Sequence, residues 1–253
     1  MLRKLVSAVM AMLMVSAVAA VFAEGTETSR VTGSIEDDAY VLTVKLNPDE
    51  EGEWRADEMA QDDSVVRLAF SGVEGGVFTA RYEPAGDGEV SVYLRHYNAH
   101  TCDEMLGFDL LVKDGKVQEV TGGSHTASPA EEELDPYFSG TWLEKDTQFT
   151  ALEAAKRPGG GWDIAISSPM THGAYVLRAS AYYDCDYDAF VYADGVKYDL
   201  LPGEETEEKE AESGLWGTLR FAQTEDGLQL VWYGMEASGN EEVAFEAADE
   251  TGL

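Results

Sequence analysis

Apolar and polar residues alternate over many short stretches of this sequence, and this two-residue period limits the fold more than any other feature. In residues 40–46 every second residue is large and apolar, from Tyr40 to Leu46. Successive side chains of a β-strand point to opposite faces, so the pattern predicts a strand with one buried face. The same pattern recurs within residues 65–70, 78–82, 90–94 and 106–112.

The segments between these stretches are rich in glycine and in residues typical of turns. They are residues 72–76, 84–88 and 113–116. Glycine adopts the positive φ that tight hairpin turns need. Short strands separated by such turns predict an all-β sandwich, which we place at residues 30–123.

A polar stretch follows the predicted sandwich. Residues 124–136 are acidic, contain Pro129 and Pro136, and show almost no apolar period, so we expect a linker there. Eight or nine further short apolar segments lie within residues 137–248. Their number and spacing predict a meander that closes into a small antiparallel β-barrel, with an acidic loop at residues 202–213.

The first residues have the pattern of a secretory signal peptide. Arg3 and Lys4 precede an apolar run over residues 5–22, and the small residues Val21 and Ala23 lie at the end of this segment. We therefore expect cleavage after Ala23 and a secreted, extracellular protein without a stable membrane anchor. An uncleaved membrane anchor is the alternative, but no second apolar stretch of spanning length follows.

Acidic residues strongly outnumber basic ones. The chain has 49 Asp and Glu against 17 Lys and Arg, which gives a formal net charge of −32. Such a chain repels phosphates and has no basic stripe, so nucleic acid is excluded as a partner. Cationic surfaces, cationic ligands, metal ions and neutral molecules remain, and solubility alone is a simple explanation of the charge.

Candidate chemical groups form no recognisable catalytic or metal motif. Residues 184–188 have the Asp spacing that opens an EF-hand loop, but Ala189 and Gly195 occupy its required Gly and Glu positions. The segment 96–104 contains two His, one Cys and two acids without a CxxC or HxxxH frame. No nucleophile elbow, P-loop or zinc-protease motif occurs. We therefore predict a non-enzymatic protein without a cofactor or bound metal, and the pattern leaves open whether Cys102 and Cys185 form a disulfide or two free thiols.

The predicted sandwich contains three segments that resemble the chagasin-type inhibitors of papain-like cysteine proteases. They are Asn47-Pro48-Asp49-Glu50-Glu51-Gly52-Glu53-Trp54, the glycine-rich residues 72–76 and Arg95-His96-Tyr97, and the resemblance covers residues 38–113. It implies an immunoglobulin-like sandwich that binds such a protease, or another extracellular protein, through three loops. The implied contact residues are Asn47, Pro48, Asp49, Glu50, Glu51, Gly52, Trp54, Gly72, Gly75, Gly76, Arg95, His96 and Tyr97.

The sequence departs from that family at the positions that would enter the protease. The family has small threonines where this chain has Asp49, Glu50 and Glu51, and it has Pro-Trp where this chain has His96-Tyr97. Burial of carboxylates in a cleft beside a thiolate costs more free energy than burial of hydroxyl groups.

The second half resembles small lipocalin-like barrels of secreted bacterial proteins. Ser139-Gly140-Thr141-Trp142 is similar to the Gly-x-Trp start of such barrels, and residues 192–197 are similar to a later hairpin. The alternative function is therefore an extracellular carrier of a carbohydrate or another small ligand. Its possible contacts are Trp162, Tyr175, Tyr183, Trp216 and Trp232. Three loops at one end of the sandwich would favour the inhibitor, whereas a cavity inside the barrel would favour the carrier.

The signal peptide gives the first prediction. The small residues Val21 and Ala23 occupy the positions that signal peptidase recognises, so N-terminal sequencing of exported protein should begin at Glu24. A product that keeps residues 5–22 in the membrane would contradict the predicted localisation.

Overall fold

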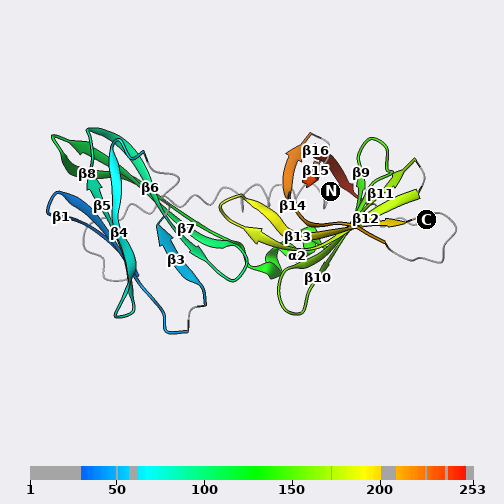
Figure 1. The fold of residues 1–253 in the computed structure, drawn as a ribbon, viewed down its shortest axis with the longest axis horizontal. Coiled ribbons are helices and arrows are strands. Elements are labelled where there is room, and N and C mark those ends of the chain that lie inside the picture. The colour runs from blue at the N-terminus through cyan, green and yellow to red at the C-terminus, as the bar shows by residue number, and fades with distance from the viewer. Residues whose placement is uncertain are drawn as a thin grey trace. The chain divides into compact units, whose positions relative to one another are not determined.

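The computed structural model describes residues 30–49, 51–56, 62–171, 173–200, 209–225, 227–236 and 239–248 (Figure 1). The predicted signal peptide and Glu50 lie outside the described residues. The chain divides into two compact units, of which the first ends at Ser128 and the second begins at Pro129. The described residues form sixteen strands and the helix α2, which confirms the all-β prediction.

The first unit is a sandwich of two four-stranded antiparallel sheets. One sheet has the order β1-β2-β5-β4 and the other the order β3-β6-β7-β8. This is the arrangement of a constant-type immunoglobulin domain, with β8 added beside the last strand. Its strands are β1 (Val31–Glu36), β2 (Ala39–Lys45), β3 (Glu53–Ala56), β4 (Val66–Glu74), β5 (Val77–Pro84), β6 (Gly88–Tyr97), β7 (Cys102–Lys113) and β8 (Lys116–Ala127).

The sandwich core consists of the alternating apolar residues of both sheets. Leu42 of β2, Leu94 of β6 and Leu110 of β7 expose no surface, and they belong to one cluster of buried side chains. Phe78 and Tyr82 of β5 join the same cluster from the first sheet. The two sheets therefore pack face to face, as the two-residue period predicts.

The second unit is a closed barrel of eight antiparallel strands. Each strand pairs with the next along the chain, and the last, β16, pairs with the first, β9. This confirms the predicted meander and its closure. The strands are β9 (Gly140–Glu144), β10 (Ala151–Lys156), β11 (Trp162–Met170), β12 (Gly173–Asp184), β13 (Ala189–Leu200), β14 (Lys209–Thr224), β15 (Gly227–Glu236) and β16 (Gly239–Ala247).

Most of the segment predicted as a linker is regular structure, and this part of the prediction was wrong. Residues 124–127 complete β8, and helix α2 spans Glu131–Phe138. The helix forms because Leu134 and Phe138 are four residues apart, so both fall on one face and become buried in the barrel unit. Acidic residues in its first turn also favour a helix N-terminus.

Helix α2 is held to the barrel by ring stacking and by two of its carboxylates. The ring of Phe138 stacks on Phe190 of β13, with centroids 3.6 Å apart and an interplanar angle of 7°. The indole N–H of Trp162 donates to Asp135 Oδ1 at 3.2 Å. Glu131 accepts a hydrogen bond of 2.7 Å from the backbone N–H of Gly161. The helix is thus part of the barrel unit.

The second prediction tests the contact between Asp135 and Trp162. Trp162 exposes no surface, so Asp135→Ala leaves its N–H buried without that acceptor and should lower the free energy of unfolding by about 1–3 kcal/mol. Calorimetry at pH 7 measures the loss. Glu133→Ala, on the exposed side of the same helix, is the matched control and should have a much smaller effect.

The same contact should depend on pH. Hydrogen bonds from the Ser139 hydroxyl and then from Trp162 lower the pKa of Asp135 in the folded protein. Because the folded-state pKa is lowered, the ionised carboxylate stabilises the fold at pH values above the unfolded-state pKa, which is about 4. This stabilisation is lost as the pH falls through the folded-state pKa. The difference between wild type and Asp135→Asn should therefore shrink below about pH 4. An unchanged difference at pH 3 would contradict this account.

Candidate functional site

The three predicted loops lie at the same end of the sandwich because of the register of its strands. Lys45, the last residue of β2, pairs with Val77 at the start of β5, and Glu53, the first residue of β3, pairs with Tyr97 at the end of β6. The connection between β2 and β3, residues 46–52, therefore runs between the β4–β5 turn and the end of β6. The backbone N–H of Leu46 donates to the carbonyl of Gly76 at 2.9 Å, which joins the first loop to the second.

Gly52 joins the first loop to the third. Its φ is 110°, and a Cβ at this position would lie 2.3 Å from the Tyr97 carbonyl oxygen and 2.9 Å from the His96 ring. Only glycine has both the conformation and the small size that this close approach requires. The first loop therefore contacts both of the others.

The β4–β5 turn has Gly75 and Gly76 at its centre. Their φ values are 59° and 78°, and two consecutive positive values are typical of a type I′ hairpin turn. Nothing lies within 4 Å of a Cβ built on either residue. The turn is thus a narrow, accessible projection without side chains at its tip.

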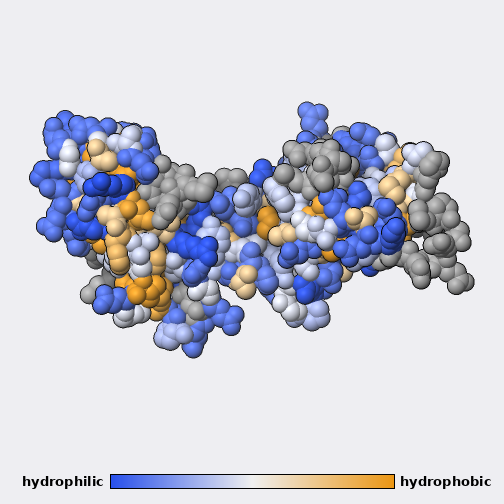
Figure 2. All heavy atoms as spheres, in the orientation of Figure 1, coloured by the Kyte–Doolittle hydropathy of each residue, from blue (hydrophilic) through white to orange (hydrophobic). Residues whose placement is uncertain are grey.

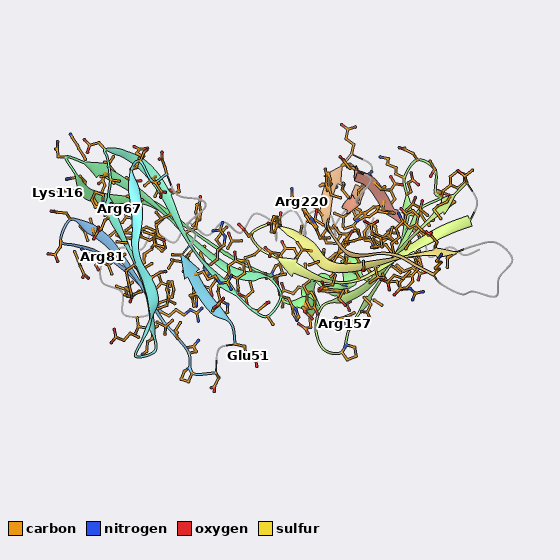
Figure 3. All side chains as sticks on the ribbon, in the orientation of Figure 1. Glu51, Arg67, Arg81, Lys116, Arg157 and Arg220 are labelled. Carbon is orange, nitrogen blue, oxygen red and sulfur yellow. The ribbon has the colours of Figure 1, made fainter. Side chains whose placement is uncertain are left out.

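The first loop presents charge to solvent. Asn47, Pro48, Asp49 and Glu51 are all exposed. Figure 3 shows Glu51 on the connection between β2 and β3. Asp49 and Glu51, two of the three carboxylates that depart from the family pattern, are therefore open to solvent.

Two of the predicted contact residues are buried and support the loops from beneath. Trp54 and His96 each expose 5% of their surface, and their ring centroids are 5.3 Å apart. His96 Nδ1 lies 2.6 Å from Asp103 Oδ1 on β7. Arg95 and Tyr97, the neighbours of His96 on β6, are half-buried and point to the opposite face of the sheet, where a partner can reach them.

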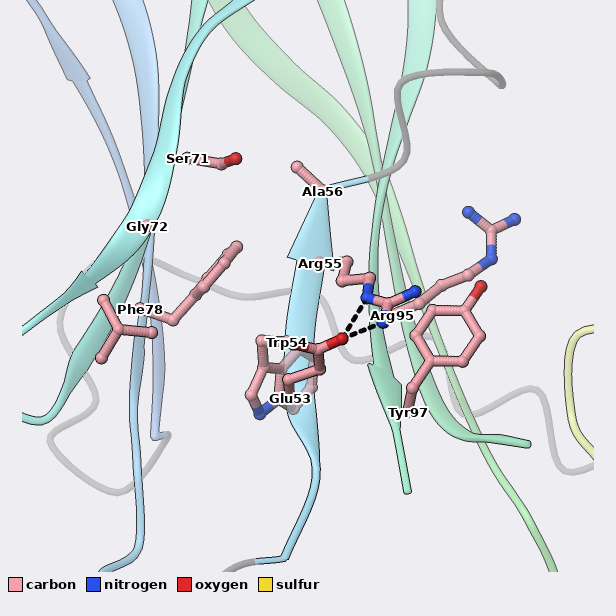
Figure 4. Close-up of a pocket in the computed structure, with 10 residues that line it drawn as sticks. Glu53, Trp54, Arg55, Ala56, Ser71, Gly72, Phe78, Arg95 and Tyr97 are labelled. Atoms are coloured by element: carbon pink, nitrogen blue, oxygen red, sulfur yellow. Dashed lines mark hydrogen bonds and ion pairs between the residues drawn. The ribbon is translucent and has the colours of Figure 1, made fainter. Parts of the chain in front are cut away.

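Beside these loops is a pocket of about 630 Å³ between β3 and β4, which the sequence did not reveal (Figure 4). Ser71 and Val73 of β4 pair with Ala80 and Phe78, both of which are core positions. Ser71 and Val73 therefore face inward, but Val73 is 61% exposed. The pocket is lined by Glu53, Trp54, Arg55, Ala56, Ser71, Gly72, Val73, Phe78, Arg95 and Tyr97.

Two arginines and two tyrosines lie along the polar side of this pocket and the adjoining sheet face. Arg55 and Arg95 are direct cross-strand partners. The Arg55 guanidinium forms an ion pair with Glu53 and lies 5.0 Å from the ring centroid of Tyr97. The Arg95 guanidinium lies 5.4 Å from the ring centroid of Tyr93. Stacking on tyrosine leaves the N–H edges of a guanidinium able to bind a carboxylate, and Arg55 binds that of Glu53 in this way.

The aromatic residues predicted as ligand contacts in the barrel lie mostly in its core. Trp162 and Trp232 expose no surface, and Tyr175 is 7% exposed. The indole N–H of Trp232 donates to the Tyr192 hydroxyl at 2.9 Å, and the hydroxyl of Tyr183 donates to Asp188. Of the five predicted contacts, Trp216 is 49% exposed and Tyr183 is half-buried.

The remaining candidates are the two cysteines and the acidic segment 184–188. Cys102 and Cys185 are both buried, one in each unit. The carboxylate of Asp184 accepts hydrogen bonds from the backbone N–H groups of Asp186 and Tyr187, which places it in a turn. Among the described residues, no three His, Cys, Asp or Glu side chains come together as metal ligands.

No family model, curated protein or solved structure matches this chain. Within the part of the chain that the structure describes, no helix is long and apolar enough to cross a membrane.

The third prediction tests the contact between the first and third loops. Gly52→Ala should destabilise the sandwich by about 1–3 kcal/mol, because it combines a strained φ with a backbone clash. Gly75→Ala is the matched control, since its φ is also positive but its surroundings are open; about 1–2 kcal/mol of conformational cost is expected there. Urea unfolding measures both.

Chemical shifts separate the two variants further. The amide signals of His96 and Tyr97 should move in Gly52→Ala and stay in place in Gly75→Ala, because only Gly52 lies against the end of β6. Shifts that are the same in both variants would show that the first loop does not contact β6 in solution.

Proposed function

We propose that this chain is a secreted, non-enzymatic binding protein whose sandwich unit inhibits a papain-like cysteine protease through the three loops. One observation carries the proposal: the connection between β2 and β3 bonds to Gly76 and packs against Tyr97, so the three loops form one continuous edge. Loops held at the end of a rigid sandwich are a common arrangement for recognition. The resemblance of residues 38–113 to chagasin-type inhibitors supports the choice of partner.

The shape of this edge suits insertion into a cleft. The tip formed by Gly75 and Gly76 carries no side chains, so its backbone can approach an enzyme surface closely. Tyr97 is half-buried, with its ring held beneath Arg55. A fixed aromatic side chain of this kind is typical of the few residues that supply most of the binding free energy in an interface.

The charge of the first loop restricts the target. Asp49 and Glu51 lose hydration on entering a cleft, and a cleft that contains a thiolate repels them. The target should therefore have basic residues along the rim of its cleft. The net charge of −32 would accelerate encounter with such a cationic surface.

The fourth prediction measures inhibition directly. Against a panel of papain-like proteases, the full chain should inhibit at least one, and Tyr97→Ala should weaken the complex by about 1–3 kcal/mol, or about 5- to 150-fold in Kd. Tyr233→Ala is the matched control, because this exposed tyrosine of the barrel unit lies outside the three loops.

The same panel tests the role of the loop charge. The double variant Asp49→Thr, Glu51→Thr should bind proteases with an uncharged cleft rim more tightly than wild type does, because repulsion and desolvation are removed. If neither wild type nor this variant inhibits any protease at micromolar concentration, inhibition is the wrong function.

A further inference from the structure

The pocket between β3 and β4 has the form of a peptide groove. We use the name edge groove for the residues Trp54, Ala56, Ser71, Val73 and Phe78, with Arg55 and Arg95 at its rim. In Figure 4 the groove separates β4, with Ser71 and Gly72, from β3, with Trp54 and Ala56. Its volume of about 630 Å³ lies within the range of roughly 300–1,000 Å³ that is usual for ligand sites.

The wall on β4 is apolar and uncovered. Val73 faces inward beside Phe78 and is nevertheless 61% exposed; Phe70, 53% exposed on the same strand, pairs with Arg81 and points to the other face of the sheet. Figure 2 shows apolar side chains gathered over β4 on this face of the sandwich unit. Exposed apolar residues on an edge strand promote unwanted association, so their presence here favours a specific occupant.

The wall on β3 contains a buried hydrogen-bond donor. Trp54 is 5% exposed, lines the groove, and its Nε1 has no hydrogen-bond partner among the described residues. Figure 4 shows its indole extending from β3 to the side where Phe78 lies. A buried N–H without an acceptor costs free energy.

Both walls are sheet edges. β3 is the outermost strand of the sheet β3-β6-β7-β8, and β4 is the outermost strand of the sheet β1-β2-β5-β4. An edge strand presents backbone donors and acceptors that an added strand can pair with. The occupant that suits both walls is therefore an extended peptide segment, which adds backbone hydrogen bonds to the apolar contact.

The rim indicates the charge of the occupant. Arg55 and Arg95 lie directly opposite each other, and Glu53 is the one carboxylate among the lining residues. This local excess of positive charge stands out in a chain with 49 acidic and 17 basic residues. It favours acidic groups on the occupant. A second copy of this chain would bring a charge of −32 against −32, so mutual repulsion disfavours self-association as the use of the groove.

We propose that the edge groove binds an extended acidic peptide segment of a partner protein by strand addition. An apolar side chain of the segment enters between Trp54 and Val73, and an Asp or Glu beside it binds Arg55 and Arg95. This site shares Trp54 and Arg95 with the proposed protease-binding residues, but it goes beyond the proposed protease inhibition and does not depend on it.

The test uses the full chain and a phage-displayed library of random ten-residue peptides. Selection should enrich peptides in which apolar and acidic residues alternate, and a synthetic peptide of the enriched sequence should bind the full chain. Val73→Arg should weaken that binding about tenfold or more, because it fills the groove with a charged side chain. Val120→Arg is the matched control, since Val120 is an exposed valine on β8, the edge strand at the other side of its sheet, and should leave binding unchanged.

Three results would overturn the proposal: no enriched peptide, enriched peptides that are basic, or equal binding to wild type and Val73→Arg. Sedimentation of the full chain tests whether a second copy of the chain occupies the groove. A dimer that Val73→Arg abolishes would assign the groove to a second copy and also overturn the proposal.

The double variant Asp49→Thr, Glu51→Thr alters the loops outside the edge groove, so it should change protease binding without changing peptide binding. Failure of one function is thereby distinguished from failure of the other.

Discussion

The pairing of the short strand β3 with the end of β6 determines most of the candidate binding surface. Its register places Trp54 opposite His96 and Arg55 opposite Arg95. Trp54 and His96 consequently face the core, and Arg55, Arg95 and Tyr97 face outward. A slip of β3 by one residue would turn Trp54 outward and Arg55 toward the core. The same pairing brings Gly52 against Tyr97, and it leaves the other side of β3 as one wall of the edge groove.

A strand of four residues has few backbone hydrogen bonds to hold this register, so side-chain contacts must contribute. The Arg30 guanidinium lies 5.2 Å from the Trp54 ring centroid and forms an ion pair of 2.7 Å with Glu104 of β7. Glu104 also lies 3.0 Å from the ring nitrogen of His125 on β8. Arg30 and Glu104 are partly buried, which reduces solvent screening of their ion pair. Trp54 is thus held by Arg30, which Glu104 of β7 fixes in turn, as well as by His96 on β6.

The sequence predicted those features that depend on neighbouring residues. The alternation of apolar and polar residues predicted β2, β5, β6 and β7, because each of these strands has one face in the core. The paired glycines predicted the β4–β5 turn. Helix α2 was missed because the two prolines and the acids of residues 124–136 suggested a linker, whereas the spacing of Leu134 and Phe138 was the signal for a buried helix face. The edge groove could not be predicted, because it depends on how two strands distant in the sequence are placed in different sheets.

The two candidate surfaces of the sandwich unit carry opposite charge preferences. Asp49 and Glu51 on the first loop favour a cationic partner, whereas Arg55 and Arg95 at the groove rim favour an acidic one. At physiological salt, electrostatic interactions between exposed charges are largely screened beyond about 8 Å, so each surface acts mainly on what it contacts. The net charge of −32 acts during approach, where it slows acidic partners and accelerates basic ones. Added salt should therefore slow the encounter with a basic protease. For an acidic peptide, added salt should reduce the general repulsion from the chain and should also weaken the bonds between the peptide and the two arginines. The two effects of salt on the peptide act in opposite directions, so its affinity should vary less with ionic strength than that of the protease.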